Sequence, residues 1–332
     1  MVSKEREVAI EAVLKASKVC QKVFNTLVKG ETVIKPDESP VTIGDFASQA
    51  IVSITLKKYF PDFKLVGEEN SQALKESNSL RKRVTGLVND TLEEKYSEDD
   101  VMEAIDRGTF EGGSSGNFWV IDPIDGTKGF LRGGQYAVCL GYAINGEINL
   151  GVLGCPNLPC NDMDENGPKG CLFIGEKGLG AFQRNFGSNE DIPIHISSAS
   201  STEKAKFCES FEAAHSSHKD SAEIAKLLNI TLPPIRIDSQ CKYGIIARGN
   251  AEIYLRFPRE GYVENIWDHA AGSLIVKEAG GIVCDVFGKP LDFSKGRKLL
   301  NNKGVIATNG IVHNQVMNAI KSVFKLNNVL LT

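Results

Sequence analysis

Histidine is scarce in this 332-residue sequence, and closely paired cysteines are absent. The five histidines and the eight scattered cysteines, none in a CxxC motif, offer no zinc-ligand spacing. We therefore expect the cysteines to be buried thiols in a reducing compartment. No apolar run approaches the ~20 residues of a membrane helix. The charged N-terminus, Ser3-Lys-Glu-Arg-Glu7, is typical of neither a signal peptide nor a transit peptide. We expect a cytoplasmic protein, with an organellar pool as the alternative if a leader precedes these residues.

A strong excess of charge of one sign is also lacking. The chain has 38 Lys+Arg and 42 Asp+Glu, for a net charge of −4. A weakly acidic surface argues against non-specific binding of nucleic acid or lipid, although it allows a locally basic pocket. Hydrophobic residues at 42% and charged residues at 24% exclude collagen-like and disordered classes. We expect a monomer with a small-molecule substrate and with neither a nucleic-acid nor a membrane partner.

Hydrophobic periodicity predicts a mixture of helices and strands in the first half of the chain. Helices are predicted over 3–29, 42–60 and 97–107, the last with Ser97 as its N-cap. A strand is predicted over 64–67, and another, over 118–121, runs into Asp122. Further strands are predicted over 136–144, 148–153, 172–175 and 181–184, with a hairpin turn at Asn145-Gly146 and loops over 156–170 and 185–191.

The second half alternates between strands and helices. Strands are predicted over 206–211, 234–238, 251–257, 281–286 and 304–308. Helices are predicted over 218–229, 240–248, 267–279 and 310–324. This pattern indicates an α/β layer after an α+β first half. We expect an N-terminal α+β domain over 1–190 that carries a metal site, and a C-terminal α/β domain over 191–332.

The densest chemical signal runs from Trp119 to Gly129. The predicted strand delivers Asp122 at its end, and Pro123 restricts the backbone so that Asp125 can turn back beside it. Two carboxylates this close repel each other unless a cation lies between them. The Gly126-Thr127 step exposes backbone N–H groups that suit a phosphate oxygen. An Asp-Pro turn followed by a helix cap is the competing interpretation.

The spacing of this motif separates it from three other classes of site. A haloacid-dehalogenase phosphatase needs Asp-x-Asp-x-Thr, whereas two residues separate Asp122 from Asp125 here. An EF-hand needs alternating acids with Gly at position six and Glu at position twelve, and the residues after Asp122 do not provide them. No G-x-x-x-x-G-K-[ST] motif occurs, which excludes a P-loop NTPase. The interpretation that remains is Mg²⁺-assisted phosphate chemistry.

Other acidic residues support this interpretation only in combination. Glu68-Glu69 ends a predicted strand, and Asp268 opens a predicted helix. An exposed acidic turn and an ordinary N-cap are their local alternatives. Asp45 has capping-box-like spacing from Thr42, which is a structural explanation for that carboxylate.

Together, these motifs resemble the lithium-sensitive, Mg²⁺-dependent phosphomonoesterases of the inositol monophosphatase and fructose-1,6-bisphosphatase superfamily. Within it, the chain is most similar to 3′(2′),5′-bisphosphate nucleotidases of the plant and fungal halotolerance type. The superfamily motifs are Gly67-Glu-Glu69, Asp122-Pro-Ile-Asp125-Gly-Thr127 and Trp267-Asp-His-Ala-Ala-Gly272. The stretches similar to nucleotidases are Ser39–Asp45, Glu212–His218, Asp238–Tyr243, Tyr254–Pro258 and Pro290–Phe293. The resemblance covers nearly the whole chain.

The resemblance implies a layered αβαβα sandwich and a set of site residues. Two or three Mg²⁺ ions would be held by Glu68, Asp122, Asp125, Asp268 and the carbonyl of Ile124. Asp45 and Thr127 would be the catalytic pair that orients and deprotonates the attacking water. The substrate would be held by Gly126, Thr127, His215, Ser239, Lys242, Arg256 and Asp268. Without the resemblance, His215 is explained as a surface histidine, Ser239 as a helix cap, Lys242 as a solvated lysine and Arg256 as a strand-edge arginine.

The implied reaction is hydrolysis of the 3′-phosphate of adenosine 3′,5′-bisphosphate, giving AMP and phosphate, with 3′-phosphoadenylyl sulfate as a further substrate. One alternative is inositol polyphosphate 1-phosphatase activity, alone or as a second activity. Another is an inactive nucleotide-binding sensor, against which the full set of acids and Thr127 argue. Gly134 and Asn70 depart from the residues that are common in relatives, but neither is an expected ligand.

Overall fold

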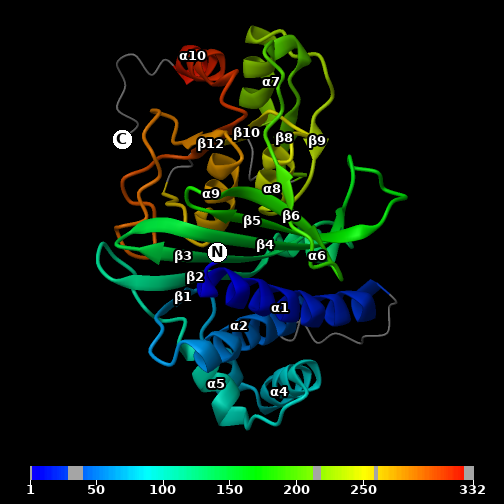
Figure 1. Ribbon diagram of the computed structural model, residues 1–332, viewed down its shortest axis with the longest axis vertical. Coiled ribbons are helices and arrows are strands. Elements are labelled where there is room, and N and C mark those ends of the chain that lie inside the picture. The colour runs from blue at the N-terminus through cyan, green and yellow to red at the C-terminus, as the bar shows by residue number, and fades with distance from the viewer. Residues whose placement is uncertain (1, 29–39, 212–217, 258–260, 325–332) are drawn as a thin grey trace.

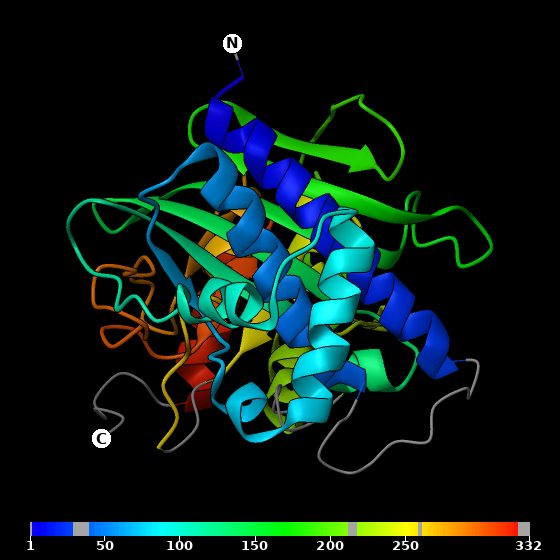
Figure 2. The same ribbon diagram turned by 90° about the horizontal axis from the view of Figure 1, so that it is seen from below.

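The computed structural model describes residues 2–28, 40–211, 218–257 and 261–324 of the chain. Figure 1 shows alternating layers of helices and sheets in the order αβαβα, and Figure 2 shows from below how the first helical layer lies over the larger sheet. This arrangement confirms the predicted layered sandwich. The middle layer consists of α8 (Cys241–Ala247) and α9 (Ala270–Glu278), which lie between the two sheets. Residues from both halves of the chain therefore meet around these two helices.

The first helical layer covers one face of the larger sheet. It contains α1 (Lys4–Val28) and α2 (Pro40–Tyr59), which pack against each other and against the sheet. The helices α3 (Gln72–Glu76), α4 (Asn78–Leu92) and α5 (Glu98–Asp106) complete this layer on its outer side. Hydrophobic side chains of α1 and α2 are buried in one cluster with those of this sheet, and their burial stabilises the layer.

The three helices predicted in this region are confirmed by α1, α2 and α5. Ser97 caps α5 in a capping box with Asp100, as its position before an acidic first turn predicted. The helices α3 and α4 were not predicted. Because α2 begins at Pro40, Asp45 lies inside the helix, and the capping-box explanation for Asp45 is wrong.

The larger sheet has seven strands in the order β1-β2-β3-β4-β5-β6-β7. β1 is parallel to β2, and each later pair is antiparallel. The strands are β1 (Leu65–Gly67), β2 (Asn117–Asp125), β3 (Ala137–Ile144), β4 (Glu147–Pro159), β5 (Lys169–Glu176), β6 (Gly180–Asn185) and β7 (Ile192–Ile194). Asn145 and Gly146 both have positive φ, at 53° and 79°, which confirms the predicted hairpin turn. β4 continues to Pro159, so the loop predicted from 156 is wrong at its start.

The smaller sheet has five strands in the order β11-β12-β10-β8-β9. β8 is parallel to β9 and β10, whereas β12 is antiparallel to β10 and β11. The strands are β8 (Phe207–Glu209), β9 (Ile235–Arg236), β10 (Ile253–Arg256), β11 (Ile282–Cys284) and β12 (Val305–Thr308). The outer helices are α7 (His218–Leu227) and α10 (His313–Phe324). Each strand and helix predicted after residue 192 is present, although the strands are shorter than predicted.

The helices α8 and α9 approach each other closely because one of them carries a glycine at the contact. A Cβ atom on Gly272 of α9 would lie 2.2 Å from Cδ2 of Tyr243 in α8. A side chain there would force the two helices apart.

β7 pairs with β6 in the larger sheet, just after the expected domain break. The division into domains over 1–190 and 191–332 stays a prediction.

All eight cysteines lie within the described residues, are buried and form no disulfide, which confirms the expected buried thiols. None of the described helices is long and apolar enough to cross a membrane.

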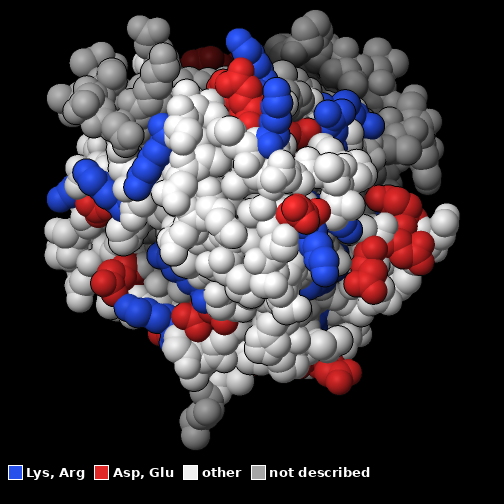
Figure 3. Space-filling view, turned by 90° about the horizontal axis from the view of Figure 1, so that it is seen from above, with Lys and Arg blue, Asp and Glu red and all other residues white. Residues whose placement is uncertain are grey.

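Figure 3 shows the face at the α7 and α10 end, where described acidic and basic side chains lie around a largely uncharged centre. This mixture of charges agrees with the small net charge of the sequence.

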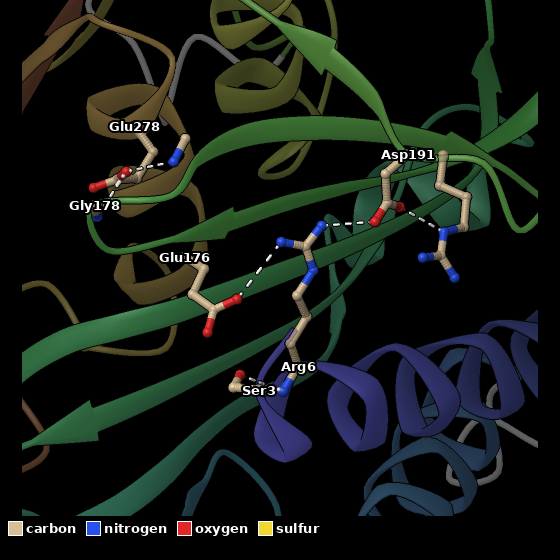
Figure 4. Close-up of polar contacts among 8 residues, drawn as sticks. Ser3, Arg6, Glu176, Gly178, Asp191 and Glu278 are labelled. Atoms are coloured by element: carbon tan, nitrogen blue, oxygen red, sulfur yellow. Dashed lines mark hydrogen bonds and ion pairs between the residues drawn. The ribbon is translucent and has the colours of Figure 1, made fainter. Parts of the chain in front are cut away.

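A buried arginine attaches the start of α1 to the larger sheet (Figure 4). Nη2 of Arg6 lies 2.7 Å from Oδ2 of Asp191, and its Nη1 lies 3.5 Å from Oε2 of Glu176. Nε of Arg184 lies 2.7 Å from Oδ1 of Asp191. The guanidinium of Arg6 also lies over the ring of Phe182, 4.6 Å from its centroid. These contacts hold the helix against β5 and β6.

We expect Arg6→Met to lower the free energy of unfolding by about 1–3 kcal/mol, because a buried charged hydrogen bond is lost. Burial would raise the pKa of Asp191, but contacts with Arg184 and Arg6 hold it below the ordinary 3.8. A depressed carboxyl pKa contributes stability that is present above this value and is lost as the pH falls below it. The effect of the substitution on stability should therefore shrink as the pH falls below 3.8. Urea unfolding of the wild type and the variant at several pH values measures this difference in the free energy of unfolding.

Lys15→Met on the same helix is the matched control. Nζ of Lys15 lies 2.6 Å from Oε1 of Glu11, but the side chains are 36% and 33% exposed. An exposed pair of this kind contributes about 0.3–0.5 kcal/mol. Equal losses of stability in the two variants would contradict a special role for the Arg6 contacts.

Candidate active site

Ten of the twelve expected site residues line one cavity of about 370 Å³ between the two sheets. They are Glu68, Asp122, Ile124, Asp125, Gly126, Thr127, Ser239, Lys242, Arg256 and Asp268. Asp45 does not line this cavity but lies close enough for its charge to affect Asp122. His215 lies outside the described residues. The fold thus gathers residues that are separated by up to two hundred positions in the sequence.

The Asp122-Pro-Ile-Asp125 segment is a bulged strand end rather than a turn. β2 continues through it, and the pairing with β3 shifts between Asp122, opposite Cys139, and Asp125, opposite Ala137. Ser48 Oγ of α2 donates a hydrogen bond of 2.8 Å to the carbonyl of Pro123. Bulges of this kind redirect side chains at the ends of strands. The competing Asp-Pro turn interpretation is therefore wrong.

The Gly126-Thr127 step, which is expected to bind phosphate, lies at the start of a short helix, α6 (Thr127–Leu131). Gly126 is its N-cap and has a φ of 87°, a conformation that favours glycine. A Cβ atom on Gly126 would also lie 2.8 Å from Cβ of Ser239. Ser239 itself has a φ of 67°, and its Oγ accepts a hydrogen bond of 3.2 Å from N of Cys241. Glycine therefore allows α6 to approach the start of α8 at the cavity.

Glu68 follows β1 and is positioned by a buried glutamine from α2. Oε1 of Gln49 accepts a hydrogen bond of 3.0 Å from N of Glu69, and its Nε2 donates one of 2.8 Å to the carbonyl of Glu69. Nε2 also donates to the carbonyl of Ile105 at 2.9 Å. A Cβ atom on Gly67 would lie 2.6 Å from Oε1 of Gln49, so glycine makes room for the amide. Glu68 is exposed and faces the cavity.

Arg297 connects the same segment to the residues before α9. Its Nη1 donates to the carbonyls of Gly108 and Phe110 at 3.1 and 3.0 Å, and its Nη2 donates to the carbonyl of Gly67. The guanidinium lies over the ring of Trp267, 5.0 Å from its centroid. Trp267 directly precedes Asp268. Arg297 therefore positions the segment that carries Glu68 relative to the segment that carries Asp268.

The three aspartates at the centre of the cavity repel one another. Asp122, Asp125 and Asp268 each offer a carboxylate oxygen within 4.8 Å of the others. Burial, with the charges of Glu68 and Asp125, raises the pKa of Asp122 well above its ordinary value. Burial and Asp268 raise the pKa of Asp125 to about 6, although Lys242 and Arg256 oppose this shift. Ionisation of all three groups therefore requires a compensating positive charge.

The donor atoms in this cluster fit a divalent metal ion. Oδ1 of Asp122 is buried and has no hydrogen-bond partner in the described part of the chain. Oδ1 of Asp45 is also buried without a hydrogen-bond partner in the described part of the chain. Burial and the charges of Glu69 and Glu68 raise the pKa of Asp45. Loss of hydration in the cavity, together with Asp268, raises the pKa of Glu68 to about 8. Carboxylate oxygens without donors are the ligands that hard divalent cations prefer.

Lys242 is buried beside these carboxylates, so its interpretation as a solvated lysine is wrong. It is 5% exposed and lies in the first turn of α8. Nζ donates to the carbonyl of Ser239 at 2.9 Å and to that of Ile237 at 3.5 Å. It also lies over the ring of Tyr254, 5.3 Å from the centroid. Burial lowers the pKa of Lys242, while the charge of Asp125 opposes this shift.

Arg256 is held by a second acidic residue that the sequence patterns did not indicate. Its Nε lies 2.9 Å from Oε1 of Glu264, and its Nη2 lies 2.6 Å from Oε2. Burial would raise the pKa of Glu264, but His269 and Arg256 lower it to about 2. Nε2 of His269 lies 3.2 Å from Glu264, and its Nδ1 lies 2.7 Å from the hydroxyl of Tyr243. This buried chain of contacts fixes the guanidinium.

Asp268 lies beside this chain of contacts. Its Oδ2 is 3.6 Å from Nη2 of Arg256. The N-cap of α9 is His269, so the ordinary N-cap interpretation of Asp268 is wrong. The carboxylate of Asp268 lines the cavity, near the other acids, instead of capping the helix.

Gln240 joins the two sides of the acidic cluster. Its backbone N–H donates to Oδ2 of Asp125. Its side chain donates from Nε2 to the carbonyl of Trp267 at 2.8 Å and accepts at Oε1 from N of Gly272 at 3.0 Å. The residue is 2% exposed. No local pattern marks this role of Gln240, because Asp125, Trp267 and Gly272 are all distant from it in the sequence.

We expect Gln240→Ala to lower the free energy of unfolding by about 2–4 kcal/mol, because two buried partner groups lose their hydrogen bonds. The backbone bond to Asp125 is retained. The segment before Asp268 should become less ordered, and metal affinity should fall. Chemical unfolding and calorimetric titration with Mg²⁺ measure these effects. Gln72→Ala on exposed α3 is the control and should change stability by no more than about 0.5 kcal/mol. A Gln240 variant that matches this control would refute the positioning role.

Comparisons with known proteins agree with this arrangement. A model of the inositol monophosphatase family matches residues 1–323. A 3′(2′),5′-bisphosphate nucleotidase of Emericella nidulans is 46% identical over 97% of this chain and 99% of its own. The nucleotidase of Schizosaccharomyces pombe is 45% identical over 96% and 95%. 3′(2′),5′-Bisphosphate nucleotidase 1 of Arabidopsis thaliana is 47% identical over 83% and 84%.

Solved structures share the fold at lower sequence identity. The inositol monophosphatase of Anabaena is 23% identical, with a TM-score of 0.61, over 96% of this chain and 95% of its own. The extragenic suppressor protein SuhB of Bartonella henselae is 22% identical, with a TM-score of 0.64, over 96% and 99%. The match of the family model over nearly the full length, joined by the named relatives, establishes that the chain belongs to the inositol monophosphatase family, which is metal-dependent.

Proposed function

We propose that the chain is a Mg²⁺-dependent phosphomonoesterase that removes the 3′-phosphate of adenosine 3′,5′-bisphosphate, giving AMP and phosphate. We further propose that it acts on 3′-phosphoadenylyl sulfate. The main support is one cavity in which clustered carboxylates face two cations, the buried Lys242 and the partly buried Arg256. Relatives that are more than 40% identical carry the name of this activity.

The metal-binding residues follow from the cluster of acids. Glu68, Asp122, Asp125, Asp268 and the carbonyl of Ile124 would hold the ions, of which we propose two or three, as is common for phosphoryl transfer at paired metal sites. When bound, Mg²⁺ supplies positive charge to the phosphate oxygens and lowers the pKa of a bound water. The unpartnered Oδ1 of Asp122 supports this assignment.

Thr127 and Asp45 are proposed to prepare the attacking water. The hydroxyl of Thr127 lines the cavity at the start of α6 and would orient the water. Oδ1 of Asp45 would accept the proton, since it is buried and has no hydrogen-bond partner among the described residues. Burial and the charges of Glu69 and Glu68 raise the pKa of Asp45, which makes its carboxylate a stronger base. No described hydrogen bond joins Asp45 to Thr127 directly.

The remaining residues are proposed to hold the nucleotide. Gly126 and Thr127 offer backbone N–H groups to the reacting phosphate, and Ser239 offers a neutral hydroxyl. Lys242 would bind the second phosphate, because its ammonium is hydrogen-bonded only to neutral carbonyl groups among the described residues. Arg256 would contact the ribose side of the cavity from its fixed position beside Glu264. His215 is also proposed as a substrate contact.

Phosphate release from a panel of substrates tests the proposed activity. With Mg²⁺, we expect release from adenosine 3′,5′-bisphosphate and none from AMP, the expected product. Removal of the metal with EDTA should abolish release. Lithium should inhibit, because it resembles Mg²⁺ in size but supplies half the charge. Release from inositol polyphosphates alone would favour the alternative activity, and no release with nucleotide binding intact would favour the sensor.

A further inference from the structure

Three tyrosines line the cavity, but they differ strongly in exposure. Tyr243 and Tyr254 are 1% and 3% exposed, whereas Tyr262 is 43% exposed. The apolar residue Ile124, which also lines the cavity, is 1% exposed. Most other lining residues are polar or charged, and the remainder are glycines. Among the described lining residues, Tyr262 is therefore the one aromatic side chain with a large exposed fraction.

Tyr262 lies close enough to Arg256 for the two side chains to interact. Arg256 is itself held by Glu264, at 2.6 and 2.9 Å. Partial burial, with the negative charges of Asp268 and Glu264, raises the pKa of Tyr262 to about 12. The side chain is therefore a neutral aromatic ring at neutral pH, and 43% of its surface is exposed.

We propose that Tyr262 stacks on the nucleobase of the substrate and thereby favours nucleotides over phosphate esters without a base. This inference rests on the proposed function and adds the group that recognises the base. The carboxylates and Lys242 suit phosphate and ribose oxygens but offer no flat face to a base, and the planar guanidinium of Arg256 is held by Glu264. An aromatic ring does so for every base, since each has a π-face. The ring contributes affinity without selecting one base.

The proposal predicts a loss that depends on the substrate. Stacking on an aromatic side chain changes affinity roughly fivefold to a hundredfold. For Tyr262→Leu, we expect KM for adenosine 3′,5′-bisphosphate to rise by about this factor, with kcat within about twofold of the wild type. The base-free substrate 1-O-methylribose 3,5-bisphosphate should be hydrolysed with unchanged kcat/KM. Tyr262→Phe keeps the ring and should raise KM for the nucleotide by no more than about threefold.

Two results would overturn the inference. Equal losses by Tyr262→Leu on both substrates would assign Tyr262 to the phosphate, the ribose or the fold. No loss on either substrate would place the base elsewhere in the cavity. If the wild type releases phosphate from neither substrate, the proposed function fails separately. The inference is then tested by calorimetric titration with AMP, for which Tyr262→Leu should still bind more weakly than the wild type and Tyr262→Phe.

Discussion

Replacing Asp125 with asparagine is expected to lower kcat by about a thousandfold or more, because a metal ion supplies several kcal/mol of charge stabilisation to the transition state. The carboxylate lies within 4.8 Å of those of Asp122 and Asp268. An amide oxygen can still accept the hydrogen bond from the backbone of Gln240, but it carries no charge for the ion. Phosphate release measures the loss of turnover, and calorimetric titration with Mg²⁺ measures the loss of metal affinity. Near-normal turnover in the variant would refute the metal assignment.

The same substitution should leave the metal-free protein equally stable or more stable. Burial and Asp268 raise the pKa of Asp125 from 3.8 to about 6. A carboxyl group whose pKa is raised by folding contributes stability to the folded protein below its pKa in the unfolded chain. This contribution is lost as the pH rises through about 6. The side-chain amide of the Asp125→Asn variant does not ionise, so its gain in stability should be absent near about pH 4, grow as the pH rises and be complete above about pH 6.

Thermal unfolding in EDTA across this range measures the effect on stability. Asp62→Asn is the control, because Asp62 is exposed and lies outside the acidic cluster. This control should change neither turnover nor the pH dependence of stability. A large loss of stability in metal-free Asp125→Asn would mean that the carboxylate supports the fold rather than the ion.

Replacing Lys242 with methionine is expected to lower kcat/KM for adenosine 3′,5′-bisphosphate by about tenfold to more than a hundredfold. Hydrogen bonds to charged groups contribute about 1.5–3 kcal/mol, which corresponds to this range. The second phosphate of the substrate requires a cation, and Lys242 is buried in the cavity with only carbonyl acceptors among its described hydrogen bonds. Methionine retains an unbranched stem of similar length against Tyr254, which limits the structural loss.

The informative comparison is between two substrates. A small monophosphate such as inositol 1-phosphate uses only the metal centre and should lose little activity in Lys242→Met. Lys226→Met on α7 is the matched control, since Lys226 is exposed and remote from the lining residues. Equal losses on both substrates would mean that Lys242 serves the reacting phosphate or the fold, and the nucleotide-specific role would then be wrong.

The helices and strands with strong local signals could be predicted from the sequence. α1 has apolar residues at helical spacing over its whole length, and the hairpin between β3 and β4 turns at Asn145-Gly146, the dipeptide that suits two positive φ angles. Ser97 caps α5 through residues within one turn. In contrast, α4 was not predicted, although Leu80, Val84, Leu87, Val88 and Leu92 recur at helical spacing along it. This helix could therefore have been predicted from its periodicity.

The acids of the candidate site could also be predicted, because they occur in short motifs. Asp122 and Asp125 are three positions apart, and Glu68 and Asp268 each follow or precede a recognisable element. The residues that position these acids could not be predicted. Gln49 contacts Glu69 across 20 positions, and Gln240 contacts Asp125 across 115. A hydrogen bond at such a separation leaves no periodic pattern in the sequence.

By itself, the sequence determined the order of the elements, the family resemblance and the set of carboxylates, because these depend on neighbouring residues and on short motifs. Only the tertiary structure decided which of these groups are buried, which are paired and which lack partners among the described residues. Lys242 reads as an ordinary charged residue in the sequence, yet it is 5% exposed beside Asp125. Arg256 reads as a strand-edge arginine in the sequence, yet Oε2 of Glu264 lies 2.6 Å from its Nη2. The physical reason is that desolvation and charge pairing depend on distances in space, which are set when the two sheets close around α8 and α9.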